Sequence, residues 1–404
     1  MDSSLPTPSI PSKINLLKGH PNDLMLPEEP MKEAFKILSG QSLSPSSPSP
    51  SNLPTYLNYG DERGNASFLP ILASFIEDST KADVSDSNGC SPDTLFVTQG
   101  ISHSLEILCR ILKPSSVMLE SPSYFLAASI FLSNGVTICS PPPMDVVNGG
   151  IDLDELERML EKSLVPVPSA IYIIPTNNNP TGMTYSSSRR EKLVRLASTY
   201  GITVIADEVY HLLDWREGAP RPGRMVSIAG AEPSLTISLN SFTKIFSPGL
   251  RLGWIECKHQ PLLSKIENLG YIRSQGGVAP LNAELMRIVL TNDLFSPHLA
   301  SVKSALKLRL DMILEKVASC PNITVPYPPT GGYFLWLKLL NVTGDEAAVV
   351  RALEDSQGVI VLAGSSCCQP SAPPLDGIFV RICFACLDTG LLMEGIDRIC
   401  DFFS

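Results

Sequence analysis

The sequence predicts an α/β protein whose large domain has a mostly parallel sheet covered by helices on both faces, with a smaller α+β domain after it. Two observations lead to this prediction. Between about residues 60 and 290, short continuous apolar runs alternate with segments of helical period, which is typical of buried parallel strands. After residue 290 a long amphipathic segment precedes a group of strands and a closing helix, as in α+β domains.

The expected strands of the large domain can be read in chain order. They are TLFVTQG, SVMLESPSY, TICSPPP, AIYIIPTNNN, ITVIADEVY, LTISLNSFTK and RLGWIE. Segments with helical period lie between several of them, namely SHSLEILCRILK, DLDELERMLEKS and SRREKLVRLASTY. Because a strand, a helix and a second strand in succession form a crossover unit, most of these strands are expected to run parallel.

The smaller domain is expected to contain the helix HLASVKSALKLRLDMILEKVAS, the strands GGYFLWLKL, GVIVLAG and IFVRICFAC, and the final helix LLMEGIDRICDFF. We place the large domain at residues 55–290 and the small domain at 291–404. Residues 1–54 form an N-terminal segment, part of which is expected to pack on the small domain. Its Ser/Pro-rich stretch, 41–54, is interpreted as a loop.

The composition excludes several classes of protein. The 404 residues are 44% hydrophobic and 18% charged, which is incompatible with disorder of the whole chain. The net charge of −10 and the lack of a long basic run disfavour a nucleic-acid or anionic-membrane partner. No apolar run is long enough to span a bilayer, and the N-terminus lacks the features of a secretory signal. A cytoplasmic location is therefore the default expectation.

Ten cysteines raise the question of a metal site or disulfides. Cys367 and Cys368 are adjacent, and Cys383 and Cys386 form a C-x-x-C pair within a strand-like segment. Nearby His and Cys residues do not complete four zinc ligands at finger spacing. The cysteines are therefore expected to be reduced and to act as small hydrophobic residues, with no metal bound.

Polar or aromatic residues follow five of the expected strands. Ligands of open α/β sheets bind beyond the carboxyl ends of the strands, so these residues are expected to meet in one crevice. Taken singly, each also has a structural interpretation as a helix cap, a turn or a packing residue. The residues are Gly100, Ile101, Ser102, Tyr124, Asn177, Asn178, Asn179, Asp207, Tyr210, Ser241, Thr243 and Lys244.

The loop after the sixth strand combines the most informative groups. Ser241, Thr243 and Arg251 provide the hydroxyls and the guanidinium that bind phosphate. Lys244 follows a buried strand, and a lysine whose pKa is lowered by burial becomes a nucleophile towards carbonyls. Together with the inward-pointing Asp207, these groups predict an aldehyde cofactor that carries a phosphate and a basic ring nitrogen. Pyridoxal 5′-phosphate fits this description.

Six motifs then identify a family resemblance. SFTKIFSPGLRLGW, NNNPTG, ADEVY, YGDERG, GGYFLWL and VRICFA resemble motifs of the class I/II aminotransferase family of fold-type I pyridoxal-phosphate-dependent enzymes. They stand in the order found in that family. The resemblance extends from about Ile14 to the C-terminus. It implies an enzyme with pyridoxal phosphate as cofactor, amino acids and 2-oxo acids as substrates, and a homodimer with shared active sites.

The resemblance also implies the catalytic and ring-binding roles. Lys244 would form the internal Schiff base and then move the proton between the substrate Cα and the cofactor. Asp207 would keep the pyridine nitrogen protonated. Asn179 and Tyr210 would hydrogen-bond the 3′-oxygen of the ring, and Tyr124 would stack on the ring face.

Phosphate and substrate contacts are implied in the same way. Ser241, Arg251 and the N–H groups of Ile101 and Ser102 would hold the phosphate, with Thr243 a weaker candidate. Tyr59 would reach the phosphate of the other subunit across the dimer interface. Arg381 would bind the substrate α-carboxylate, and Gly19 would bring backbone close to the substrate.

Several positions depart from the family pattern. Asn178 stands before Asn179-Pro180, and Ala363-Gly364 replaces a usual proline-glycine. His103 follows the phosphate turn, and His20 lies in the expected substrate loop. Each histidine is either a specificity residue or, as is commoner for a lone histidine, a hydrogen-bonded structural residue. These departures leave the identity of the substrate open.

Three functional hypotheses follow. The leading one is a ping-pong aminotransferase that moves an amino group from an L-amino acid to a 2-oxo acid. The second keeps the cofactor but changes the reaction, giving a lyase for β- or γ-elimination, such as carbon–sulfur cleavage, or a specialised biosynthetic enzyme. A regulator that retains the fold only to bind a ligand is disfavoured, because no helix-turn-helix pattern precedes the large domain.

Overall fold

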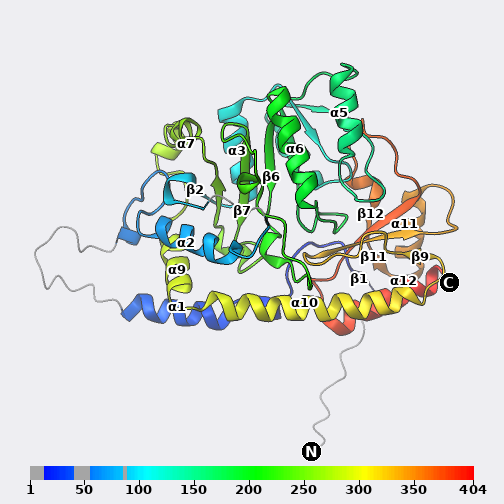
Figure 1. Ribbon diagram of the computed structural model, residues 1–404. Coiled ribbons are helices and arrows are strands. Elements are labelled where there is room, and N and C mark those ends of the chain that lie inside the picture. The colour runs from blue at the N-terminus through cyan, green and yellow to red at the C-terminus, as the bar shows by residue number, and fades with distance from the viewer. Residues whose placement is uncertain (1–12, 41–54, 85–88) are drawn as a thin grey trace, which may run out of the picture.

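The computed structural model describes residues 13–40, 55–84 and 89–404 of the chain (Figure 1). A seven-stranded sheet forms its larger part, with strand order β2-β8-β7-β6-β5-β3-β4. The strands are β2 (Leu95–Thr98), β3 (Ser116–Leu119), β4 (Thr137–Cys139), β5 (Ala170–Ile173), β6 (Thr203–Asp207), β7 (Thr236–Ser241) and β8 (Gly253–Glu256). Only β8 runs antiparallel to its neighbours, which confirms the predicted mostly parallel sheet.

The reversed direction of β8 has a consequence for ligand binding. The carboxyl ends of β2, β3, β5, β6 and β7 lie at one edge of the sheet, because these strands share a direction. An antiparallel strand begins at the edge where its neighbours end. Arg251, two residues before β8, is therefore brought to the same edge as Ser241 at the end of β7.

Both faces of the seven-stranded sheet are packed, as alternation along β5 shows. Ala170 and Tyr172 belong to the main hydrophobic cluster, whereas Ile171 and Ile173 belong to a second cluster with residues of α5 and α6. Successive strand residues point to opposite faces, so each face has its own apolar layer. The expectation of helices on both faces is confirmed.

The helices vary widely in length. The longest, α10, runs along the bottom of the molecule in Figure 1, from the region of α1 and α9 to that of α12. The helices are α1 (Glu28–Gly40), α2 (Phe68–Thr80), α3 (Ile101–Leu112), α4 (Phe125–Ser133), α5 (Leu153–Glu161), α6 (Ser187–Tyr200), α7 (Gln260–Glu267), α8 (Gly270–Arg273), α9 (Pro280–Thr291), α10 (Phe295–Ala318), α11 (Glu346–Gln357) and α12 (Thr389–Phe402). None of the helices in the described ranges is long and apolar enough to cross a bilayer.

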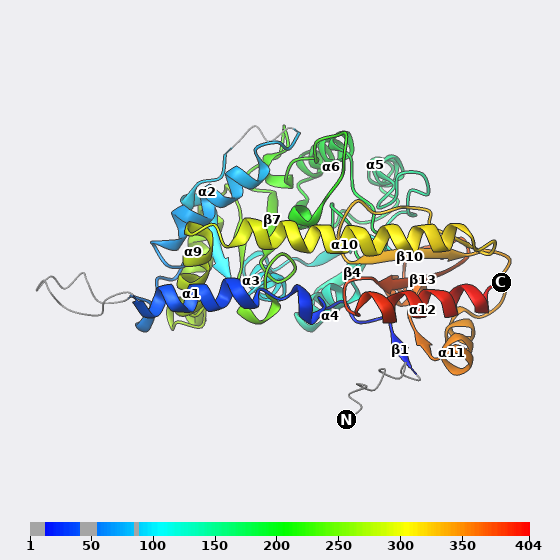
Figure 2. The ribbon, with the colours of Figure 1, turned by 90° about the horizontal axis from the view of Figure 1, so that it is seen from below.

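The C-terminal part of the chain forms a second, antiparallel sheet with strand order β12-β13-β10-β9. Its strands are β9 (Ile323–Thr324), β10 (Phe334–Leu339), β12 (Leu362–Ala363) and β13 (Ile378–Cys383). The N-terminal strand β1 (Ile14–Asn15) pairs in parallel with β11 (Val359–Ile360), and Figure 2 shows it beside α11 and α12. The segment after β1 is thus anchored to this C-terminal part. The Ser/Pro-rich stretch predicted as a loop lies outside the described residues.

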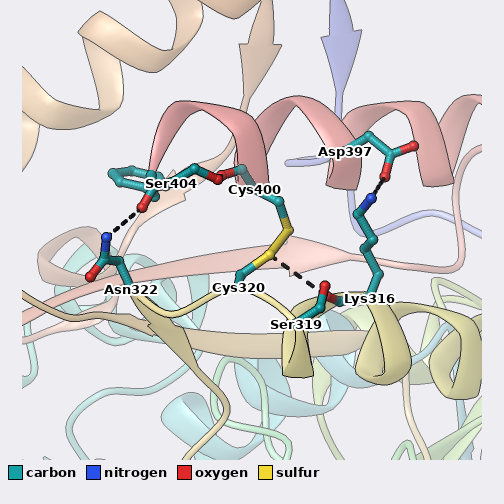
Figure 3. The surroundings of a disulfide bond; sticks show 8 residues. Lys316, Ser319, Cys320, Asn322, Asp397, Cys400 and Ser404 are labelled. Carbon is teal, nitrogen blue, oxygen red and sulfur yellow. Dashed lines mark hydrogen bonds and ion pairs between the residues drawn. A yellow bond between two sulfur atoms is a disulfide. The ribbon is translucent and has the colours of Figure 1, made fainter.

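One expectation about the cysteines is wrong. Cys320, just after α10, and Cys400, within α12, form a disulfide with a Cα–Cα distance of 5.9 Å (Figure 3). The other eight cysteines are free, as expected. The pair was not recognised in the sequence because 80 residues separate the two cysteines, and only the packing of α10 against α12 brings them together. An ion pair between Lys316 and Asp397 joins the same two helices at 2.6 Å.

We predict that Cys320→Ser lowers the free energy of unfolding by about 2–5 kcal/mol, because the disulfide restricts the unfolded chain. Thermal melts with and without a reductant measure the effect, since reduction of the natural protein should lower its Tm to that of the variant. Cys139→Ser, which removes a free and half-buried thiol, is the control. Equal melting of oxidised natural protein and Cys320→Ser would contradict the prediction.

Candidate active site

A cavity of about 490 Å³ lies at the carboxyl edge of the seven-stranded sheet. The N-terminal segment and two strands of the smaller sheet close it, through Leu17 to Pro21, Phe334 and Arg381. Most of the residues predicted for the site line this one cavity. They are Gly19, Ile101, Ser102, Tyr124, Asn179, Asp207, Tyr210, Thr243, Lys244, Arg251 and Arg381.

Lys244 projects into the cavity from the loop after β7. Its Nζ donates a hydrogen bond to the carbonyl oxygen of Gly19 at 2.6 Å and lies 5.1 Å from the centre of the Tyr333 ring. Burial lowers the pKa of Lys244 to about 8, and the Arg381 guanidinium contributes in the same direction. None of the described residues forms an ion pair with it. About a tenth of the amine is therefore neutral and nucleophilic at pH 7, a far larger share than for an ordinary lysine.

Asp207, the last residue of β6, supplies the carboxyl group of the cavity. Tyr172 on β5 donates a hydrogen bond to Oδ2 at 2.8 Å, and the backbone N–H of Val209 donates to Oδ1 at 3.3 Å. Burial raises the pKa of Asp207 to about 6. No lysine or arginine among the described residues forms an ion pair with this carboxylate, so a cationic group of a ligand can serve as its partner.

The hydroxyl groups and the guanidinium predicted to bind phosphate surround a small hollow. Ser241 Oγ donates to Thr243 Oγ1 at 2.7 Å, and Arg251 Nη2 donates to the carbonyl oxygen of Gln99 at 2.8 Å. Gly100 has a φ of +102°, and a Cβ there would lie 3.3 Å from Ser241 Oγ and 3.4 Å from Arg251 Nη2. A side chain at Gly100 would therefore fill the hollow.

The hollow also faces the start of α3, which begins at Ile101. The N–H groups in the first turn of a helix have no intrahelical acceptor, and they favour an anion together with the helix dipole. Backbone donors, hydroxyls and a guanidinium thus converge where a phosphate group fits. The donor set and the hollow together are compatible with the phosphate of pyridoxal phosphate.

Arg381 on β13 faces the cavity from the smaller sheet. Its Nη1 donates to Asn179 Oδ1 at 2.9 Å and its Nη2 donates to the carbonyl oxygen of Leu17 at 2.6 Å, whereas its Nε has no hydrogen-bond partner within the described part of the chain. The guanidinium lies 4.2 Å from the centre of the Phe334 ring. Because Asn179 Oδ1 is the acceptor for Arg381, the amide nitrogen of Asn179 remains a donor.

Aromatic side chains form much of the remaining wall. Tyr124 precedes α4 and is half-buried, whereas Tyr210 is only 3% exposed and packs edge-on against Phe334. Burial raises the pKa of Tyr210 well above its ordinary value, so its hydroxyl stays protonated and available as a donor.

Five predicted residues do not line the cavity, namely Tyr59, Gly100, Asn177, Asn178 and Ser241. Ser241 lies behind the wall and is 2% exposed, although its Oγ borders the hollow beside Gly100. Tyr59 is 82% exposed and lies outside the cavity. Tyr59 therefore does not contribute to the cavity formed by its own chain.

The two histidines differ in position. His20 lines the cavity and is exposed to it. His103 instead accepts a hydrogen bond from the Gln99 backbone N–H at 3.0 Å, and its Nε2 lies 2.8 Å from the Tyr271 hydroxyl. Burial lowers the pKa of His103. These contacts favour the structural interpretation for His103.

Sequence reasoning missed several contributors to the site. Tyr172 holds Asp207, Tyr333 donates to the Lys244 carbonyl oxygen at 2.9 Å, and Phe334 packs under Arg381. A tyrosine inside the otherwise aliphatic run AIYII is a signal that could have identified Tyr172, because a buried phenol needs a hydrogen-bond partner.

The comparisons with known proteins agree with this geometry. The sequence profile of the family aminotransferase class I and II matches residues 41–399. An uncharacterized protein of Saccharomyces cerevisiae is 28% identical, over 81% of this chain and 82% of its own length. A 2-aminoadipate transaminase of Thermus thermophilus is 27% identical, over 79% of this chain and 77% of its own length.

Among solved structures, the kynurenine aminotransferase of Pyrococcus horikoshii shares the fold with a TM-score of 0.81. It is 23% identical to this chain, and the superposition covers 97% of this chain and 91% of that protein. The profile match spans most of the sequence, and the cavity provides an amine, a carboxylate and a hollow bordered by hydroxyl groups and a guanidinium. The chain belongs to the class I and II aminotransferase family and is a transaminase that depends on pyridoxal phosphate.

Proposed function

We propose that the enzyme moves an amino group from an L-amino acid to a 2-oxo acid in a ping-pong cycle centred on Lys244. The observation that carries this proposal is the meeting of Lys244, Asp207 and the hollow beside Gly100 in one cavity. An amine, a carboxylate that forms no ion pair with the described residues, and a phosphate cradle match the aldehyde, the ring nitrogen and the phosphate of the cofactor. When bound, the cofactor supplies a ring that withdraws electrons from the substrate Cα.

The residues of the cavity are proposed to hold the cofactor and to transfer the substrate proton. Lys244 binds the cofactor aldehyde and later carries the proton that leaves the substrate Cα. Asp207, oriented by Tyr172, keeps a proton on the ring nitrogen. The amide nitrogen of Asn179 and the hydroxyl of Tyr210 would donate to the 3′-oxygen of the bound cofactor, and Tyr124 would cover the face of its ring.

Arg381 is proposed to bind the substrate α-carboxylate. Its planar guanidinium suits two parallel hydrogen bonds to a carboxylate. The carbonyl oxygen of Leu17 now accepts from Nη2 and would have to give way to the substrate. The neighbouring carbonyl of Gly19 accepts from Lys244, so the same segment contacts both reactive groups.

The side-chain pocket favours a large apolar or aromatic amino donor. Beside the cofactor residues, the cavity is lined by the apolar residues Leu17, Phe125, Leu126 and Phe334 and by the polar residues Lys18 and His20. Apolar walls bind apolar side chains by removing their surface from water. A 2-aminoadipate-like donor is the alternative, because the Thermus thermophilus relative is a 2-aminoadipate transaminase.

A homodimer with shared sites is proposed from the position of Tyr59. Tyr59 and the nearby Leu57 are both strongly exposed on the segment that precedes α2. A tyrosine outside its own cavity is free to complete the phosphate site of a second copy. The cytoplasmic location and a role in amino-acid biosynthesis remain predictions.

We predict that each molecule of loaded enzyme converts one molecule of a suitable amino acid to its 2-oxo acid when no acceptor is present. The cofactor retains the amino group, so the absorbance of the aldehyde form should disappear in proportion to the protein. Aromatic, large aliphatic and 2-aminoadipate donors are tested separately. Repeated turnover with release of ammonia and no acceptor would instead indicate a lyase.

We predict that cofactor-free enzyme captures pyridoxal phosphate with a pH midpoint near 8, the lowered pKa of Lys244. Above this pH most of the amine is neutral and attacks the aldehyde, whereas an ordinary lysine has a pKa of about 10.4 and becomes mostly neutral only above that pH. Capture is followed by the visible absorbance, with N-acetyl-lysine as the reference amine and Lys244→Ala as the blank. A midpoint matching the reference amine would refute the prediction.

Mixed dimers provide a test of the shared site. Tyr59→Ala should bind the cofactor weakly, and Lys244→Ala should be inactive. In a mixed dimer, the site with an intact Lys244 receives the intact Tyr59 of the other subunit. We therefore predict that mixing the two variants after dissociation restores up to one active site per two subunits. Failure to recover cofactor affinity would argue that Tyr59 does not act across an interface.

A further inference from the structure

Glu120, directly after β3, is a fully buried carboxyl group that the catalytic scheme above does not use. Its Oε1 accepts hydrogen bonds from the Ile174 N–H at 2.6 Å and from Asn178 Nδ2 at 2.7 Å. Its Oε2 accepts from the Tyr185 hydroxyl at 3.1 Å. Among the described residues, Glu120 has no ion pair with an arginine or lysine. A buried carboxyl group is costly, so its retention at this place requires a reason.

The contact with Asn178 connects Glu120 to the site. Asn178 Oδ1 accepts from both the N–H and the hydroxyl of Thr181, at 3.2 and 3.0 Å. The Asn178 backbone N–H donates to the Met183 carbonyl at 2.9 Å. The side-chain amide of Asn178 is therefore hydrogen-bonded through both its nitrogen and its oxygen. Its contact with Glu120 fixes the side chain against the end of β3.

The next residue, Asn179, enters the cavity and accepts from Arg381. On the other side of Glu120, the chain continues through Ser121 to Ser123 and reaches Tyr124, which also lines the cavity. One carboxyl group thus ties together the loop that carries Tyr124 and the loop that carries Asn179. These loops follow neighbouring strands, β3 and β5.

We propose that Glu120 is a positioning residue that acts through Asn178 to hold Asn179 against the 3′-oxygen of the cofactor and against Arg381. The inference rests on the proposed roles of Asn179 and Arg381. It assigns a function to Asn178, one of the positions at which this chain departs from the family pattern. It also explains why a buried carboxyl group stands beside the site without touching it.

The charge of Glu120 is secondary to its hydrogen bonds. Burial raises the pKa of Glu120 to about 8, against the effect of its three donors, and the nearby Asp207 raises it further. A neutral side chain of the same shape should therefore accept the hydrogen bonds that Glu120 now accepts from Ile174 and Asn178. Glutamine keeps an oxygen acceptor for Ile174 and Asn178, whereas alanine leaves both donors unpaired in the protein interior.

The test compares Glu120→Ala, Glu120→Gln and the control Tyr185→Phe in the full-length holoenzyme. Tyr185→Phe removes a donor to the same carboxyl group but leaves the link to Asn178 intact. The readouts are the pH midpoint of the bound-cofactor absorbance, cofactor affinity, kcat and KM for the amino donor, and Tm. The natural enzyme must first pass the half-reaction test, so that failure of the proposed function is recognised separately.

Glu120→Ala should raise the pH midpoint by about one unit, because a displaced Asn179 no longer stabilises the negative charge on the 3′-oxygen. It should also lower kcat/KM by roughly 10- to 100-fold. Glu120→Gln should restore both values nearly to those of the natural enzyme. Tyr185→Phe should lower the Tm and leave the midpoint unchanged.

Asn178→Ala breaks the same link from its other end and keeps the inference testable if Glu120→Ala does not fold. It should reproduce the shift in midpoint, and in a double variant with Glu120→Gln the shift should not increase further. The proposal is overturned if Asn178→Ala or Glu120→Ala lowers the Tm while the pH midpoint and the KM stay at their natural values.

Discussion

The site depends on the cost of placing the Lys244 amine inside a cavity where no carboxylate of the described residues forms an ion pair with it. Transfer of an ammonium group from water into protein surroundings is unfavourable, and the pKa of Lys244 falls to about 8 in response. The carbonyl oxygen of Gly19 and the face of the Tyr333 ring partly compensate. The neutral amine is the form that attacks an aldehyde. Burial therefore disfavours the charged lysine and, for the same reason, favours the reactive one.

The sheet topology determines which groups surround this amine. Lys244 follows β7, which lies between β6 with Asp207 and the antiparallel β8 with Arg251 at its start. Neighbouring strands are separated by about 5 Å. The carboxylate of Asp207 and the guanidinium of Arg251 therefore come from the two strands that flank β7, whose following loop carries Lys244.

Much of the fold and of the site follows from local sequence. Continuous apolar runs alternating with helical segments indicated a parallel sheet, and the polar residues after those runs indicated its ligand-binding edge. Lys244, Asp207 and Arg251 could be predicted because each stands in a short motif next to a strand. The disulfide between Cys320 and Cys400 could not, because it depends on how two distant helices pack.

By itself, the sequence determined the order of the strands along the chain, the chemical groups at their ends and the family to which those groups point. These properties depend on neighbouring residues, and the period of side chains along a strand or helix makes them readable. The tertiary structure alone decided which distant groups meet. The contact of Tyr172 with Asp207, the link from Glu120 to Asn178 and the closure of Leu17 over Arg381 each join separate segments. Such contacts arise from strand order and packing, which no local pattern specifies.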